Sequence, residues 1–324
     1  MPQHPSTELD YHDLVARHPW VIERDQSCIL SPDSDGLLCG LLMSHYLGWQ
    51  IRGFYDGKVL AIEEGVSSQN CVFLDMEIFR PNIRSVGQHM VMYDKANLPP
   101  NWSNFANCIA ANNLRNYDFK NDFKLKYPLG TVHVLLSVLG QNQTISIPKS
   151  AVAPLLYTDG TFKNQFNYPE NCLSWLDYLG ANNTNNPLQK VFLDRHYSTY
   201  ELMNELKDLF AEINTIGGGK RGGDKIKISD SRGNIANIDS RTHLLKSATK
   251  TQAEAFLSML SDKTGWTFNA AHWSWGPYRT VKFRKGSIKP GKARYNALLA
   301  QNPISLAIIS RNSIEYTIDG DGVL

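Results

Sequence analysis

The sequence predicts an α/β protein with a mainly parallel sheet, flanking helices and a smaller α+β unit toward its C-terminal end. Three observations predict this class. The first half alternates short apolar runs with helical patterns, which is typical of βαβ units. Carboxylates follow several of the apolar runs, where open α/β sheets bind their ligands. The charge balance also changes sign between the two halves of the chain.

Short apolar runs in the first half are expected to form strands. They have the length of buried strands and are bounded by polar or turn-forming residues. The Asp56-Gly57 pair supplies positive φ at low cost and is expected to close a hairpin. A further apolar stretch over residues 83–92 contains His89. The predicted strands cover residues 27–30, 50–55, 70–74 and the segment 152–157 before Asp159.

Helical spacing of apolar residues predicts helices over residues 36–47 and 129–139 in the first half. Residues 199–213 show the same spacing in the second half and are expected to form an amphipathic helix. Alternation of strands and helices in the first half therefore places the predicted strands side by side and parallel.

Charge and length together predict two domains. A chain of 324 residues exceeds the size at which a single core usually stops growing. Residues 1–180 hold 13 Lys and Arg against 18 Asp and Glu, a balance of −5, whereas residues 181–324 hold 20 against 13, a balance of +7. The polar stretch at the crossover has the composition of a linker. We expect one domain over residues 1–182, a linker over 180–189 and a basic domain over 190–324.

Composition excludes several classes of protein. Hydrophobic residues at 42% and charged residues at 20% are ordinary for a soluble globular chain, and no apolar run approaches the length of a membrane span. The N-terminal residues do not resemble a signal peptide, so a cytoplasmic location is expected. The five cysteines show no Cys-x-x-Cys spacing and are expected to be buried free thiols.

Four carboxylates are expected to converge at one edge of the sheet. Asp33, Asp35, Asp75 and Asp159 all follow predicted strands, and His89 lies in the same pattern. Two unit charges at 4 Å repel by about 4 kcal/mol at an effective dielectric of 20, and a divalent ion removes that conflict. Oxygen ligands with one imidazole suit Mn²⁺ or Mg²⁺. The alternatives are a helix cap for Asp33, a turn for Asp159 and a core histidine for His89.

The motifs that carry these residues resemble the DHH phosphoesterase family. Ser31-Pro-Asp-Ser-Asp-Gly36 is similar to the family's His-x-Asp-x-Asp-Gly motif, and Phe73-Leu-Asp75 to its second motif. Val86-Gly-Gln-His-Met-Val91 lies where the Asp-His-His motif is expected, and Leu156-Tyr-Thr-Asp-Gly160 resembles the fourth motif. Tyr127-Pro-Leu-Gly-Thr131 is similar to the helix start found between the third and fourth motifs. The resemblance covers roughly residues 25–180.

The resemblance implies a phosphoesterase that uses two manganese ions and a metal-activated water. The ions would be held by Asp33, Asp35, Asp75, His89 and Asp159, which would form the catalytic site. Two motifs depart from the family pattern, because Ser31 replaces its first histidine and Gln88 replaces one of the central pair. Weakened metal binding is the consequence expected of those losses.

Basic residues are the candidates for binding a phosphorylated substrate. Arg84 and Arg115 lie between the predicted metal motifs. A glycine-rich run, residues 217–223, allows close approach of an anion and carries Lys220 and Arg221. Residues 263–313 contain no Asp or Glu and interleave basic with aromatic residues, a composition that suits single-stranded nucleic acid. The basic candidates in that region are Arg279, Arg284 and Lys285. A solvated basic face over an aromatic core is the alternative.

Three functions remain open on the sequence. The first is a metal-dependent phosphodiesterase, such as a nuclease or an oligonucleotide phosphodiesterase acting on a nucleic acid or nucleotide. The second is a nucleic-acid-binding protein with a degenerate site of the same fold. The third is a phosphohydrolase of small molecules such as cyclic dinucleotides or pyrophosphate.

Overall fold

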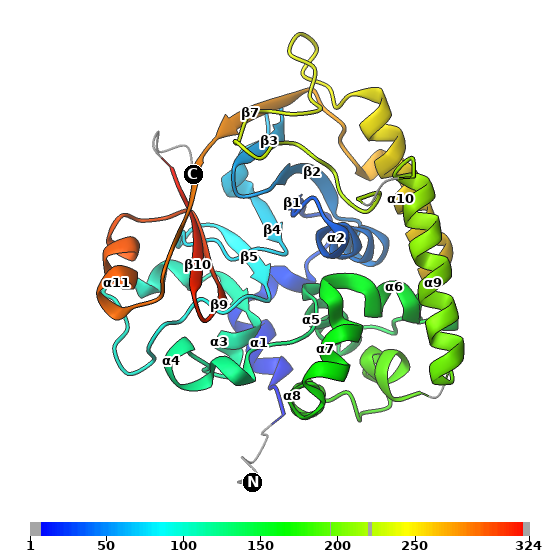
Figure 1. Cartoon of the computed structure of the whole chain (residues 1–324), viewed down its shortest axis with the longest axis horizontal. Helices are drawn as coiled ribbons and strands as arrows, with labels where there is room; N and C mark the ends of the chain where they lie inside the picture. The colour runs from blue at the N-terminus through cyan, green and yellow to red at the C-terminus, as the bar shows by residue number, and fades with distance from the viewer. Residues whose placement is uncertain (1–7, 195, 220–221, 320–324) are drawn as a thin grey trace.

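A seven-stranded sheet forms the centre of the protein in the computed structural model, which describes residues 8–194, 196–219 and 222–319 (Figure 1). The strand order is β6-β5-β4-β1-β2-β3-β7. The fold is therefore α/β, as predicted. Its strands are β1 (Ser27–Leu30), β2 (Gln50–Tyr55), β3 (Val59–Glu63), β4 (Cys71–Leu74), β5 (Arg84–Gly87), β6 (Cys108–Ala110) and β7 (Tyr278–Lys282).

Five neighbouring strands, from β6 to β2, are parallel. The chain runs from β1 to β2 on one side and later to β4 on the other, so the direction of winding changes between β1 and β4. Ligands of open α/β sheets bind beyond the carboxyl ends of the strands at such a point. The loops that follow β1 and β4 carry Asp33, Asp35 and Asp75.

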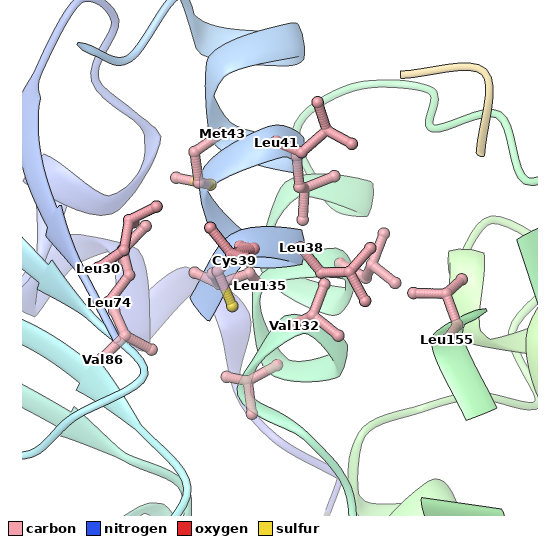
Figure 2. Close-up of a cluster of buried hydrophobic side chains, with 14 of the residues drawn as sticks. Leu30, Leu38, Cys39, Leu41, Met43, Leu74, Val86, Val132, Leu135 and Leu155 are labelled. Atoms are coloured by element: carbon pink, nitrogen blue, oxygen red, sulfur yellow. The ribbon is translucent and has the colours of Figure 1, made fainter. Parts of the chain in front are cut away.

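Helix α2 (Ser34–Leu47) is buried between the sheet and helix α5 (Thr131–Gly140), and this position explains its apolar sequence on all sides. Figure 2 shows Leu30, Leu74 and Val86 on the sheet side of α2, with Val132 and Leu135 of α5 on its other side. The two predicted helices over 36–47 and 129–139 are thus confirmed within a few residues.

The remaining helices surround this centre (Figure 1). Helix α9, predicted over 199–213, begins as expected at Thr199 and ends at Ile216, and Ser198 and Glu201 form a capping box at its start. The other α-helices are α1 (Tyr11–Arg17), α3 (Ala111–Leu114), α4 (Phe119–Asp122), α6 (Val152–Tyr157), α7 (Thr161–Asn167), α8 (Pro169–Tyr178), α10 (Ser247–Thr264) and α11 (Lys292–Ala300).

One predicted strand is wrong. Residues 152–157 form helix α6 and lie outside the sheet, packed against α9 and the core around α2. The segment is buried on nearly all sides, and a short apolar run buried in this way has the same sequence pattern in a helix as in a strand. Asp159 therefore follows a helix and not a strand.

Residues from the second half complete the central sheet. Strand β7 pairs antiparallel with β3, and the hairpin between β2 and β3 turns at Asp56-Gly57 as predicted. One buried apolar cluster contains residues of both halves of the chain, with Leu9 as its first member and Tyr278 as its last. Ala181, Asn186 and Leu188 within the predicted linker are buried. The two-domain division stays a prediction, and the main sheet and core extend across its boundary.

A separate antiparallel sheet contains β8 (Arg284–Ile288), β10 (Ser313–Ile318) and β9 (Ser305–Ser310) in that order. It packs with α11 around Tyr295, Leu299 and Ile314. All five cysteines are buried and free, as expected. None of the helices in the described part of the chain combines the length and apolar character that crossing a membrane requires.

Candidate metal centre and cleft

Three carboxylates from different elements meet at the carboxyl end of the parallel strands. Oxygen atoms of Asp35, Asp75 and Asp159 all lie within 4.8 Å of one another. Asp35 is in the first turn of α2, Asp75 directly follows β4, and Asp159 lies at the junction of α6 and α7. This convergence was predicted from the sequence, although Asp159 reaches it from a helix end.

Backbone amides at the start of α5 hold the Asp35 carboxylate. The Thr131 amide donates to Oδ2 at 2.5 Å and the Val132 amide donates to Oδ1 at 3.2 Å. Gly130 allows this approach, since a Cβ there would lie 2.9 Å from Oδ1 of Asp35. The partial positive charge of a helix N-terminus favours a carboxylate in this position.

Thr131 also links Asp35 to Asp75. Its hydroxyl donates to Oδ1 of Asp75 at 2.7 Å, while its amide binds Asp35. One residue at the helix start therefore fixes the orientation of two of the three carboxylates. Sequence reasoning did not assign Thr131 a role, but it lies in the Tyr127-Pro-Leu-Gly-Thr131 motif that signalled the helix start.

Asp75 and Asp159 both have left-handed backbone conformations, with φ of 64° and 50°. Residues other than glycine adopt this region at a cost, and such strain concentrates at functional sites. Gly160 shares the conformation of its neighbour, with φ of 63°. The sharp change of direction turns Asp159 toward Asp35 and away from the path of α6 into α7.

Burial raises the pKa of all three carboxyl groups. For Asp35, burial raises the pKa, while a hydrogen bond with Asp159 and the α5 amides oppose the shift. For Asp75, burial acts first and the charges of Asp35 and Asp33 raise the pKa further. For Asp159, loss of water around the carboxyl is again the first cause, followed by the charges of Asp35 and Asp33. A cation among them would relieve this repulsion.

Asp33 is at the rim of the centre. Its side chain caps α2 by accepting a hydrogen bond from the Gly36 amide at 3.3 Å, which is the structural role weighed for it from the sequence. It does not belong to the group of three that lie within 4.8 Å of one another. It lines both hollows described below and its charge raises the pKa of Asp75 and Asp159.

His89 faces a different carboxylate from those predicted. Its Nδ1 lies 3.2 Å from Oε2 of Glu77 and its amide donates to Oε1 of Glu77 at 2.5 Å. Glu77 is buried, and Gly87 leaves room for it. The described residues thus place His89 beside the centre, with Glu77 as the partner that orients its ring. Glu77 was not identified from the sequence, and only its position two residues after Asp75 hinted at it.

The amide of Gln88 occupies the position where the family resemblance expected a histidine. Its Nε2 donates a hydrogen bond to Oδ2 of Asp159. Asn112 in turn donates to the Gln88 carbonyl at 2.8 Å. A neutral amide group therefore holds the third carboxylate from the side of β5.

Two hollows open beside the carboxylates. The large hollow has a volume of about 390 Å³. It lies between the loops that follow β1 and β4 on one side and the small antiparallel sheet on the other. Its acidic lining includes Asp33, Asp75 and Glu77, and its basic lining includes Lys58, Lys225, Lys227 and Lys285. The small hollow, about 250 Å³, is lined by Asp33, Tyr157, Asp159, Phe162, Asp224 and Lys225.

Residues 222–229, here called the strap, cross between the two hollows. The Ile226 amide donates to the Pro32 carbonyl at 2.8 Å, and Tyr157 donates to Asp224 at 2.8 Å. Ile226 and Ile228 are buried while Lys225 and Lys227 are exposed, the alternation of an extended segment with one face on the core. Sequence reasoning stopped at the glycine-rich run and missed these two lysines immediately after it.

The arginines predicted to bind substrate between the metal motifs have structural partners. Arg84 begins β5, at the opposite end of the strands from the carboxylates, and donates to Gln26 and to the Asn70 carbonyl at 2.8 Å each. The Arg115 guanidinium stacks on Tyr117, Trp175 and Tyr178, with centroid distances of 4.7–4.8 Å. A substrate role for Arg84 or Arg115 stays a prediction, and these structural contacts do not favour it.

The basic residues of the second half are distributed over a surface. Arg279 of β7 and Arg284 of β8 are exposed, and Lys285 lines the large hollow while pairing with Glu315 at 2.7 Å. Lys220 and Arg221 lie outside the described residues. Most aromatic rings interleaved with these residues are buried, as in the alternative of a basic face over an aromatic core. The buried rings are Trp266, Trp273, Trp275, Tyr278, Phe283 and Tyr295.

No protein-family model matches this chain, and comparisons with curated proteins and with solved structures give no significant match. Only the geometry of the site then indicates a function for this chain.

Proposed function

We propose that this protein is a divalent-metal-dependent phosphodiesterase whose centre is formed by Asp35, Asp75 and Asp159. The observation that carries the proposal is the meeting of these three carboxylates within 4.8 Å, beside two hollows whose linings both include Lys225. Carboxylate oxygens are the ligands that Mn²⁺ and Mg²⁺ prefer. The order of the motifs along the chain supports membership of the DHH phosphoesterases as part of the same proposal.

The residues fit one divalent ion well. Three carboxyl groups whose pKa values are raised by burial and mutual repulsion gain most from a cation. A second ion would need Asp33 together with His89, and His89 is held by Glu77. We therefore propose that the site holds one ion strongly and a second one weakly.

The protein's own groups have distinct roles in this proposal. Asp35, Asp75 and Asp159 hold the ion, and the α5 amides and the Thr131 hydroxyl orient the first two. An ion bound there would polarise a phosphoryl oxygen and lower the pKa of water, which is the chemistry that hydrolysis of a phosphodiester requires. The Glu77–His89 pair lies on the wall of the large hollow, where an imidazole can hold or donate a proton.

The test is hydrolysis by the purified full chain. Single-stranded DNA, single-stranded RNA, short oligonucleotides, cyclic dinucleotides and pyrophosphate are each incubated with Mn²⁺, with Mg²⁺ and with EDTA. We expect nucleotide release with Mn²⁺ from at least one phosphodiester and none with EDTA. Absence of release from every substrate in both metals would overturn the proposal, and hydrolysis of pyrophosphate alone would favour a small-molecule phosphohydrolase.

A binding protein without turnover is the second candidate, and the contact of Gln88 with Asp159 favours it. The family resemblance expects metal-ligating imidazoles in this region, whereas here an amide donates to a ligand and His89 turns to Glu77. Salt-dependent binding of single-stranded nucleic acid without hydrolysis would support this candidate. The same incubation assay with a parallel filter-binding measurement separates the two.

A further inference from the structure

We infer that Lys225 binds the phosphate of a phosphodiester whose two flanking groups occupy the two hollows. The inference rests on the proposed function and names its substrate class as an internal phosphodiester. A terminal phosphate monoester has a group on only one side and would leave one hollow unfilled.

The first observation is the position of Lys225. It lines both the large and the small hollow, and Asp33 and Lys225 are the residues that the two linings share. Asp75 lines the large hollow and Asp159 lines the small one. A phosphate between the hollows would therefore lie beside Lys225 and next to the carboxylates that are proposed to hold the ion.

The second observation is that the Lys225 ammonium forms no close ion pair in the described part of the chain, although its charge acts on the Asp159 carboxylate. Among the described residues, no carboxylate lies within the 4.0 Å ion-pair distance of Lys225, although Asp33 and Asp159 are its neighbours around the hollows. By contrast Lys285 pairs with Glu315 at 2.7 Å, and Lys58 donates to the Asp230 carbonyl at 2.7 Å. Lys225 thus differs from two other lysines of the same lining.

The third observation is that the strap backbone around Lys225 is fixed. Gly223 packs against the end of α9, where a Cβ would lie 2.1 Å from the Ile213 carbonyl oxygen. Gln252 of α10 donates to the Gly222 and Lys225 carbonyls at 3.1 and 3.2 Å. Binding through Lys225 therefore orders one side chain and not a loop, which limits the entropic cost.

The hollows differ in the groups that they offer. Tyr157 and Phe162 give the small hollow two partly buried aromatic rings, which suit a flat base or sugar edge. The large hollow offers Ser305, Thr317 and the basic side chains, which suit a more polar group or a further phosphate. The two sides of the phosphodiester are therefore distinguished, and the flat base or sugar edge is expected beside Tyr157 and Phe162.

The test measures binding in EDTA, so it does not depend on turnover. Titration calorimetry compares the dinucleotide pApA with AMP on the full chain and on the variants Lys225→Gln, Lys225→Arg and Lys207→Gln. We expect pApA to bind about tenfold more tightly than AMP. We expect Lys225→Gln to weaken pApA binding about tenfold, as loss of a charged hydrogen bond does, and Lys225→Arg to keep most of it. Lys207→Gln, the control, removes an exposed ammonium of α9 that pairs with Asp208 at 3.3 Å and lines neither hollow, and it should change binding by less than about threefold.

Several outcomes would overturn the inference. These are equal binding of pApA by Lys225→Gln and the unchanged protein, equal binding of AMP and pApA, or no binding of pApA at all. Circular dichroism melts of the four proteins show that each is folded. Failure of the proposed hydrolysis leaves this binding measurement intact, and hydrolysis that is unaffected by Lys225→Gln would contradict the role of Lys225 alone.

Discussion

The charged side chains at the two ends of the parallel strands differ in their partners. At the amino ends, Arg84 donates to Gln26 and to the Asn70 carbonyl, and Arg52 pairs with Glu63 at 2.9 Å. Arg52 there has a partner of opposite charge, and Arg84 has two neutral acceptors.

At the carboxyl ends of the same strands, Asp35, Asp75 and Asp159 lie close together, and Asp35 and Asp159 hydrogen-bond to each other. Neutral groups of Gln88, Thr131 and Val132 also donate to them. The sheet is common to both ends, so the strands themselves do not explain the difference. A cation among these carboxylates is part of the function proposed above, because it would relieve the repulsion that their burial together creates.

The largest expected effect is loss of hydrolysis on Asp75→Asn. Asparagine keeps an acceptor for the Thr131 hydroxyl but removes the charge, so the fold should persist. Mutation of a group that only orients a metal ligand lowers metal affinity or activity about 10–100-fold. We expect mutation of a ligand itself to lower kcat with Mn²⁺ at least about a hundredfold. Asp208→Asn, an exposed carboxylate of α9, is the control. An Asp75→Asn protein with unchanged kcat would break the distinction between the two ends.

A smaller effect is expected from Thr131→Val. The variant keeps the amide bond to Asp35 but loses the hydroxyl bond to Asp75. We expect a loss of about tenfold in kcat and about 1 kcal/mol in the free energy of unfolding, measured by urea titration. Thr131→Ser restores the hydroxyl and should recover most of both. If the serine variant is as impaired as valine, the hydroxyl is not the group that positions Asp75.

Metal-free stability is expected to fall with rising pH because of the carboxylates. Their pKa values are raised in the folded state, so the fold holds protons that the unfolded chain releases above about pH 4. Their contribution is therefore present below the unfolded pKa and is lost as pH rises through the folded pKa values. In EDTA, Asp75→Asn should melt about 2–4 °C above the unchanged protein at pH 8, with a smaller difference at pH 4.

Added Mn²⁺ sharpens that measurement. A ligand that binds only the folded state raises the melting temperature, and protons compete with it at low pH. Mn²⁺ should therefore stabilise the unchanged protein more at pH 8 than at pH 5 and have little effect on Asp75→Asn. Equal stabilisation of both proteins would place the ion elsewhere.

The smallest effect on activity is expected from Arg84→Gln, at the amino end. Its partners are structural, so hydrolysis should change by less than about twofold while the free energy of unfolding falls by about 1 kcal/mol. Arg84→Lys is the matched variant that keeps the charge. A specific rise in KM for Arg84→Gln would restore the substrate role predicted for this residue from the sequence.

Local patterns in the sequence predicted much of the fold. Strands β1, β2 and β4 and helices α2, α5 and α9 agree with the expected ranges within a few residues. Helix α9 has apolar periodicity that matches its buried face, whereas β1, β4 and α2 are buried nearly throughout and were recognised by their length and flanking residues. The segment 152–157 failed because it is buried on nearly all sides and its pattern carries no period. Strand β7 was not predicted as part of the main sheet, since its partner β3 lies more than 200 residues away in sequence.

The sequence by itself determined that Asp35 and Asp75 would follow neighbouring strands at one edge, because parallel strands bring their carboxyl ends together. Only the tertiary structure decided which groups face them. The left-handed backbone at Asp159 places its carboxylate with those of Asp35 and Asp75. Glu77 hydrogen-bonds to His89, and the strap places Lys225 between the two hollows. These contacts join residues that are 12 to about 190 positions apart, and such pairings depend on packing that local sequence patterns do not encode.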